Sequence, residues 1–170
     1  MLVGFSAASK EQTLRFNEPK EYCGFYLDCH VHTAVTGVRT SKSIGPEIPN
    51  GLFYIVNVKV FSDAKNPEIT MRLLTPDASV VDASGNRYGR AYSAEKRLPS
   101  GDVDLGRDIH SYEAIEKEIV FDLPLNVSDP RLDIREGYGI DHVIEAVLVD
   151  DEDSIFHRRK YFDLKVSEPQ

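Results

Sequence analysis

The apolar residues of this 170-residue chain recur with a period of two over several short stretches, which is typical of half-buried β-strands. The first such stretch begins at Phe25, where apolar side chains alternate with polar ones as far as Val31. The same strand can continue to residue 40. This alternation predicts that His30 and His32 lie on the solvent side.

The stretch 52–61 is β-branched or aromatic almost throughout, which predicts a central strand with Asn57 and Lys59 on its wet face. A hairpin is expected around the turn 83–86, with Gly85 or Asn86 at the positive-φ position. Further strands are predicted at 69–75, 114–123, 131–135, 142–149 and 160–166, a loop at 41–51, and one or two helical turns at 92–98.

These segments amount to about eight strands separated by turn residues, with no long amphipathic helix and no alternation of strands with helices. They predict an all-β fold, an antiparallel β-sandwich. Residues 1–20 carry little periodicity and are expected to form a flexible N-terminal tether. Residues 21–170 are then expected to form a single sandwich domain.

Charge narrows the choice of partners. Lys and Arg total 20 against 28 Asp and Glu, a formal net charge of −8 that disfavours nucleic acid and anionic lipid. The basic residues at 157–160 follow acids at 150–153 and are interpreted as part of a mixed-charge hairpin. No apolar run reaches about 18 residues, so the chain is not expected to span a membrane.

The two cysteines leave the redox compartment open. In a straight strand Cys23 and Cys29 would have Cα atoms about 20 Å apart, beyond the ~7 Å limit for a disulfide. They could bond only if Gly24 or a neighbour interrupts the strand. Residues 1–9, apolar and then small, are expected to be either the remainder of a removed anchor or a disordered end.

Three local patterns together resemble a family. They are the long strand with its leading glycine (51–60), the segment Asp-Ala-Ser-Gly-Asn-Arg-Tyr (82–88), and Ile-Val-Phe-Asp-Leu-Pro (119–124) followed by Arg-Leu-Asp-Ile (131–134). They resemble the uncharacterised bacterial immunoglobulin-like domains found in lipoproteins and secreted antigens. The resemblance implies an immunoglobulin-like sandwich that is secreted or membrane-anchored, without enzyme activity. Ser62-Asp63 replaces the Asn that often follows the long strand in that family.

Two metal sites are conceivable from spacing. His30 and His32 could share an ion whose other ligands would come from His110, His142, His157 or an acid; alternatively they are two polar residues on a wet face. A blue-copper site is disfavoured, because both cysteines lie near the N-terminus and Met71 has no ligand beside it.

The acids Asp102, Asp104 and Asp108 could hold Ca²⁺, with Glu113 at the twelfth position of the loop. Gly106 stands where a further ligand is needed, and the sixth position lacks its glycine. An exposed acidic loop is the alternative.

No nucleophile elbow, phosphate-binding loop or activated thiol motif occurs, so the sequence predicts no catalytic residue, no metal ligand and no cofactor, and a protein that is not an enzyme. We expect a non-catalytic extracytoplasmic binding or interaction module with an unknown protein or cell-envelope partner. The alternative is a calcium- or ligand-binding accessory domain. Edge strands could pair two copies into a homodimer. Five tyrosines are candidates for partner contact or for ordinary packing: Tyr22, Tyr26, Tyr54, Tyr88 and Tyr92.

Overall fold

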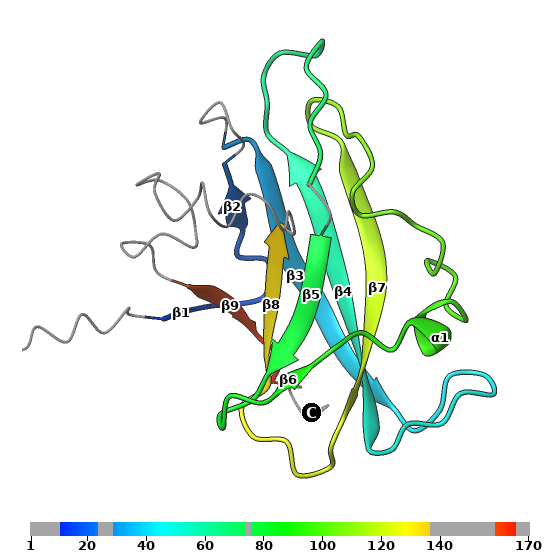
Figure 1. Cartoon of the computed structure of the whole chain (residues 1–170). Helices are drawn as coiled ribbons and strands as arrows, with labels where there is room; N and C mark the ends of the chain where they lie inside the picture. The colour runs from blue at the N-terminus through cyan, green and yellow to red at the C-terminus, as the bar shows by residue number, and fades with distance from the viewer. Residues whose placement is uncertain (1–10, 24–28, 74–75, 137–158, 166–170) are drawn as a thin grey trace, which may run out of the picture.

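The computed structural model describes residues 11–23, 29–73, 76–136 and 159–165, in which two β-sheets pack face to face (Figure 1). The four-stranded sheet has the order β2 (Lys20–Tyr22), β3 (Val31–Ser41), β4 (Leu52–Ser62), β7 (Ala114–Leu123), and its neighbours are antiparallel. The five-stranded sheet has the order β1 (Gln12–Leu14), β9 (Lys160–Asp163), β8 (Arg131–Glu136), β5 (Pro76–Val81), β6 (Arg87–Tyr88).

The central pair β3 and β4 is continuous over most of its length, and a register shift between Val35 and Gly37 marks a β-bulge. Because the bulge adds one residue, the inward face changes from odd to even positions along β3. Val35 packs in the core before the bulge, and Val38 packs against the core after it. The strand therefore keeps apolar side chains toward the other sheet on both sides of the bulge.

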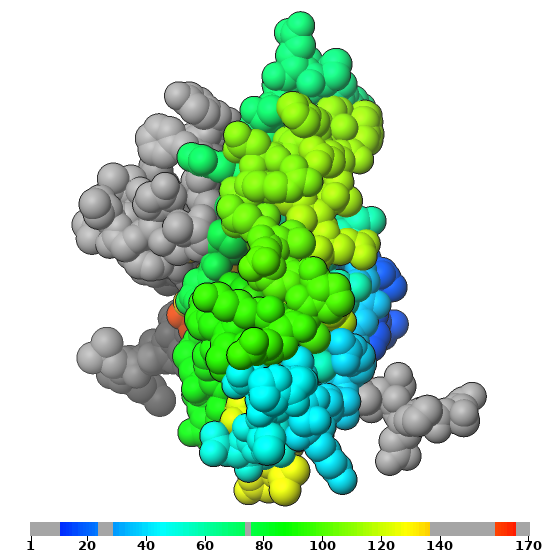
Figure 2. Space-filling model, turned by 90° about the vertical axis from the view of Figure 1, so that its right-hand side faces the viewer, coloured from blue at the N-terminus to red at the C-terminus, as the bar shows by residue number. Residues whose placement is uncertain are grey.

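The main core lies between the sheets, where alternate residues of β4 such as Val56, Val58 and Val60 are fully buried. A second cluster joins Phe53 and Ile55 to the short helix α1 (Tyr92–Glu95) through Ala94. Figure 2 looks onto this side and shows the α1 segment and the loop before β4 covering the sheet. Because both faces of the first half of β4 are covered, residues 52–56 form an unbroken apolar run, whereas Asn57 and Lys59 further along are only partly buried.

The structure confirms the all-β sandwich and several of its predicted parts. The strands expected at 52–61 and 114–123 are β4 and β7, and the helical turn within 92–98 is α1. The strands expected at 131–135 and 160–166 correspond to β8 and β9. The hairpin forms between β5 and β6, with Gly85 at φ 84°.

Other predictions differ from the structure. Residues 69–73 form no strand: Met71 makes only an isolated bridge with Ile109, and the strand begins at Pro76. Proline is accepted at that place because the first residue of a strand need not donate to the ladder. Strands β1 and β2 were not expected, and β1 lies within the range 1–20 that the sequence assigned to a tether.

Some predictions lie outside the described residues. They are the strand at 142–149, most of the charged hairpin at 150–160, the beginning of the first strand at 25–28, and Tyr26. In the described part of the chain, no helix has the length and hydropathy needed to cross a bilayer.

Candidate functional site

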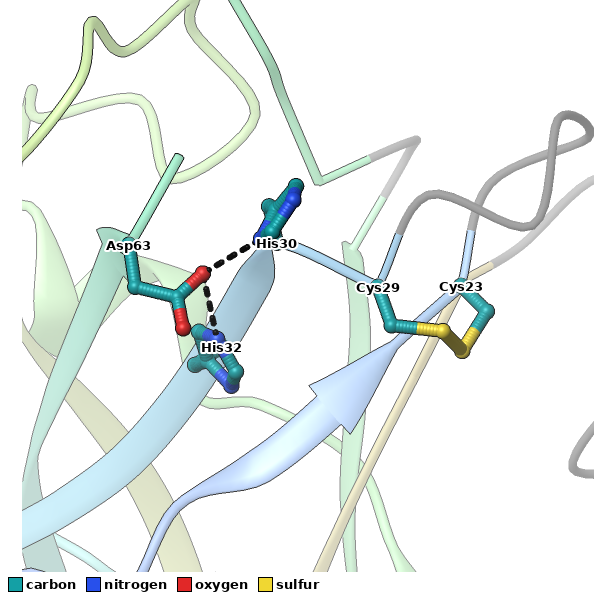
Figure 3. The surroundings of a disulfide bond; sticks show 5 residues. All are labelled: Cys23, Cys29, His30, His32 and Asp63. Carbon is teal, nitrogen blue, oxygen red and sulfur yellow. Dashed lines mark hydrogen bonds and ion pairs between the residues drawn. A yellow bond between two sulfur atoms is a disulfide. The ribbon is translucent and has the colours of Figure 1, made fainter. Parts of the chain in front are cut away.

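One end of the sandwich gathers the start of β3, the end of β4 and the turn before β7. His30 precedes β3, His32 is its second residue, and Asp63 directly follows β4 (Figure 3). The Asp63 Oδ1 atom lies 2.7 Å from His30 Nδ1 and 3.2 Å from His32 Nε2. A single carboxylate oxygen thus stands between two imidazoles.

The two histidines have different surroundings. The His30 side chain is 44% exposed, whereas that of His32 is only 7% exposed. The prediction of a wet face is therefore wrong for His32, which stacks on Phe61 of the neighbouring strand with ring centroids 5.1 Å apart. Among the described residues neither of its ring nitrogens makes a hydrogen bond, so the contact with Asp63 is electrostatic only.

Asp63 is held in its ionised form by these neighbours. Burial alone would raise its pKa, but the hydrogen bond with His30 and the contact with His32 outweigh it, and the pKa lies below the ordinary 3.8. The carboxylate is thus negative at neutral pH and accepts the hydrogen bond from the His30 imidazole.

A disulfide lies beside this cluster (Figure 3). Cys23 and Cys29 are bonded across the connection between β2 and β3, with Cα atoms 4.0 Å apart. The sequence allowed this disulfide only if the strand containing both cysteines were interrupted. It is interrupted: β2 ends at Tyr22, which pairs with Val31 of β3. The bond ties together the two strands that begin the sandwich at this end.

The cluster is not arranged as a metal centre. Within the described ranges, no three His, Cys, Asp or Glu side chains are placed to hold an ion. The Asp63 oxygen fills the space between the imidazoles that an ion would need. His110 is exposed on the following turn, and His142 and His157 lie outside the described residues. Copper chemistry has no support either, because the cysteines are bonded to each other and Met71 packs against the main core, with its sulfur 3.9 Å from Ser62 Oγ.

The acidic loop is organised by a lysine. Lys117 Nζ donates to the carbonyl oxygens of Gly101 and Val103 at 2.9 and 2.6 Å, so an ammonium group occupies the oxygens that a cation would seek. Asp104 accepts from the Gly106 N–H at 2.8 Å and closes a local turn. The structure places the predicted calcium acids in an exposed loop and does not bring Asp102, Asp104 and Asp108 together around one point.

Glu113, the candidate twelfth ligand, has other partners. It accepts hydrogen bonds from Arg107 at 2.6 Å and from the His110 N–H at 2.9 Å. The backbone hydrogen bond and the Arg107 side chain lower its pKa below 4.5, so it is anionic and already paired.

Most candidate tyrosines pack in the sandwich. Tyr22 is 4% exposed and its hydroxyl donates to the Ile134 carbonyl, while Tyr54 and Tyr88 lie against the main core. Tyr92 is 58% exposed, beneath the Arg90 guanidinium at 4.7 Å. The packing alternative therefore holds for Tyr22, Tyr54 and Tyr88.

The sequence analysis missed Tyr112, whose side chain is 71% exposed next to the histidine cluster. Its φ is 60°, a left-handed conformation that costs a bulky residue roughly 1–2 kcal/mol. Neighbouring bonds impose this conformation: Ser111 Oγ donates to the Ala64 carbonyl, and Glu113 N–H donates to the His110 carbonyl. The sequence around Tyr112 shows no strand or helix pattern, so nothing in it distinguishes this residue from other loop residues.

Comparisons with known proteins give a fold and no family. No family model matches the chain, and no curated protein matches it. A secreted protein of Mycobacterium tuberculosis, MPT63, shares 13% identity with a TM-score of 0.51, covering 76% of this chain and 100% of that one. A conserved hypothetical protein of Bacillus anthracis shares 16% identity with a TM-score of 0.47 over 71% of this chain and 94% of that one.

An uncharacterised β-sandwich protein of Clostridium difficile 630 shares 8% identity, with a TM-score of 0.43 over 92% of this chain and 97% of that one. At these identities the likeness concerns the fold alone. The class of protein that fold and site define is thus a disulfide-bonded β-sandwich with a histidine–aspartate cluster and an exposed tyrosine at one end.

Proposed function

We propose that this chain is a non-catalytic extracytoplasmic interaction module that meets its partner through the end bearing Tyr112. The single observation that carries the proposal is Tyr112 itself, a large exposed aromatic side chain held in a left-handed backbone conformation. Aromatic residues are enriched in interface cores, and strained conformations gather where function needs them. The backbone that carries the ring is already fixed, so binding does not have to order this turn.

Support for a non-catalytic role comes from the pairing of the reactive groups. Glu113 is bound by Arg107 and by the His110 N–H. The cysteines are oxidised, so no thiolate is available as a nucleophile.

The location rests on the disulfide. Disulfides persist in oxidising compartments and are rare in the cytosol, so the Cys23–Cys29 bond supports export. We extend the proposal to the immunoglobulin-like family suggested by the sequence, with residues 21–170 and β1 in one domain. Asp82 supports this extension, since its carboxylate organises the hairpin motif by accepting from Asn86 and Tyr88 at 2.8 and 2.9 Å.

The location is tested by trapping thiols in producing cells with an alkylating agent before lysis. Mass spectrometry then counts the free thiols of Cys23 and Cys29. We expect both cysteines to resist alkylation in the cells and to react with the alkylating agent only after a reductant has broken the disulfide. Two alkylated cysteines would overturn the extracytoplasmic assignment.

The contact end is tested by site-specific photo-crosslinking in producing cells, with a benzophenone amino acid replacing Tyr112. Tyr92 is also exposed but is the first residue of α1, so it serves as the matched control position. A discrete crosslinked product from position 112 that is absent from position 92 is expected. The same products from both positions, or none from 112, would contradict the proposed contact end.

A further inference from the structure

A groove lies at the opposite end of the sandwich from Tyr112, where β9 ends and β8 begins. It consists of two adjoining hollows of about 370 and 280 Å³ that share Asp163 and Lys165. The larger hollow is lined by Thr13, Ala83, Asp129, Arg131, Asp163 and Lys165. The smaller one adds Arg15 and Phe16. Hollows of a few hundred Å³ are of a size that suits small ligands.

The charges along this groove are balanced. Lys165 Nζ lies 3.2 Å from Asp129 Oδ1, and Arg131 donates to Glu11 at 2.7 Å. Asp163 accepts from the Lys165 N–H at 3.0 Å. The three side-chain cations that line the two hollows, Arg15, Arg131 and Lys165, are matched in number by the carboxylates of Asp129 and Asp163 in the lining and of Glu11 beside it. The groove as a whole therefore carries no excess charge to attract a phosphate or an ammonium group.

Donors and acceptors nevertheless remain accessible. The side chains of Lys165 and Asp129 are 67% and 59% exposed, and that of Arg131 is 23% exposed. The Arg131 guanidinium lies over the Tyr161 ring, 4.8 Å from its centroid, and this contact restrains the side chain. The groove therefore offers oriented groups of both kinds.

An aromatic side chain borders the smaller hollow on a fixed turn. Phe16 is 39% exposed, and the next residue, Asn17, has φ 64°. The Asn17 N–H donates to the Val35 carbonyl at 2.8 Å, and the Arg15 N–H donates to Glu18 at 2.9 Å. These bonds hold the turn against the sandwich, so the Phe16 ring is presented at the groove in advance of any ligand.

We infer that this groove binds a neutral, hydroxyl-rich ligand of the saccharide class. A sugar hydroxyl donates and accepts at once, so it can satisfy a carboxylate such as Asp163 and a cation such as Lys165 together. The apolar C–H face of a sugar ring suits an exposed aromatic side chain such as Phe16. The balanced charge favours a neutral sugar over its charged derivatives.

The test is a titration of the ¹⁵N-labelled protein, followed by NMR, with glucose, N-acetylglucosamine and cellobiose, and with glucuronate as the charged counterpart of glucose. A neutral sugar is expected to shift the amide signals of Asp163 and Lys165. The variants Phe16→Ala and Asp163→Asn are each expected to weaken binding about tenfold or more. Tyr112→Ala, at the other end, is the matched control and should bind as the parent does.

Absence of shifts with all three neutral sugars would overturn the inference. So would tighter binding of glucuronate than of glucose, or an equal loss of affinity in Tyr112→Ala. The spectrum of each unliganded variant verifies that it is folded. Because the groove and Tyr112 lie at opposite ends, failure here leaves the crosslinking result unaffected, and the reverse also holds.

Discussion

Gly51 illustrates how one residue limits the approach of two strands. It precedes β4 beside the end of β7, and a Cβ atom added there would lie 2.1 Å from the Leu123 carbonyl oxygen. The N–H of Gly51 also donates to the Asp122 carboxylate at 3.1 Å. The backbone of both strands would have to move to accommodate any larger residue.

We predict that Gly51→Ala lowers the free energy of unfolding by about 2 kcal/mol or more, because the clash is with backbone. Gly37→Ala is the matched control: no atom lies within 4 Å of its added Cβ, so a change within about 0.5 kcal/mol is expected. Urea denaturation of the three proteins measures both. Equal stability of Gly51→Ala and the parent would show that the strands do not need this contact.

Asp82 carries a pH dependence. Hydrogen bonds from the Asn86 side chain, the Asn86 and Ser84 backbone and the Tyr88 hydroxyl hold its pKa below 3.8 against the opposing effect of burial. The folded protein therefore binds the proton more weakly than the unfolded chain does. Its contribution to stability is complete well above pH 3.8 and is lost as pH falls through the folded pKa.

Asp82→Asn should therefore be less stable than the parent near neutral pH, and the difference should shrink in acid below about pH 3.8. The free energy of unfolding from urea titrations over this pH range provides the comparison. Asp102→Asn, in an exposed loop, should follow the parent curve. A constant difference at all pH values would mean that the Asp82 charge contributes nothing.

At the scale of elements, the α1 segment is fixed to β7 by a buried ion cluster. Glu95 is 2% exposed and bonds to Arg90, and Lys117 Nζ lies 3.2 Å from its Oε1 atom. The same segment covers the outer edge of β7: the Ala91 N–H donates to the Val120 carbonyl, and Ser100 Oγ accepts from the Glu118 N–H. Pairing of a second copy along this part of β7 is therefore obstructed.

We predict that Glu95→Ala lowers the free energy of unfolding by about 3–5 kcal/mol, because it leaves two cations buried without their carboxylate. Glu116→Ala, an exposed acid on β7, should change it by less than about 0.5 kcal/mol. Chemical denaturation distinguishes the two. A small loss in Glu95→Ala would show that water reaches the cluster.

The elements that sequence predicted well are those with enough residues to show a period, such as β4 and β7. Strands β1 and β2 have three residues each, too few for a pattern. In β2 the fully buried residue is Lys20, whose ammonium donates to the Ile134 carbonyl at 2.6 Å. Sequence patterns predict that a lysine is exposed to solvent. They cannot predict that its ammonium group is buried by a hydrogen bond to a residue far along the chain.

The candidate site was predictable only in part, for a similar reason. The spacing of His30 and His32 in the sequence predicted that the two side chains lie together, with an acid as one candidate neighbour. Which acid that is, Asp63, depends on the pairing of β3 with β4. Tyr112 owes its conformation to contacts with Ala64 and the turn around Glu113, which lie on different segments. Only the assembled end brings these residues together.

For the whole molecule, the disulfide acts mainly on the unfolded chain. It closes a short loop between Cys23 and Cys29, six positions apart, for which chain entropy gives about 2 kcal/mol. We predict that replacing both cysteines by serine lowers the free energy of unfolding by about this amount and leaves the sandwich folded. Circular dichroism during denaturation tests this, with the reduced parent as the control. An unfolded variant would mean that the bond determines the native structure.

The parallel pairing of β1 with β9 joins Gln12 to Lys160, so strands near opposite ends of the described chain complete the same sheet. During synthesis β1 stays unpaired until Lys160 and the rest of β9 have emerged. A ribosome-bound chain arrested before residue 160 should thus stay sensitive to protease. Until β9 is available, the five-stranded sheet ends at β8 on that side, so this edge is the last part of the sheet that can close.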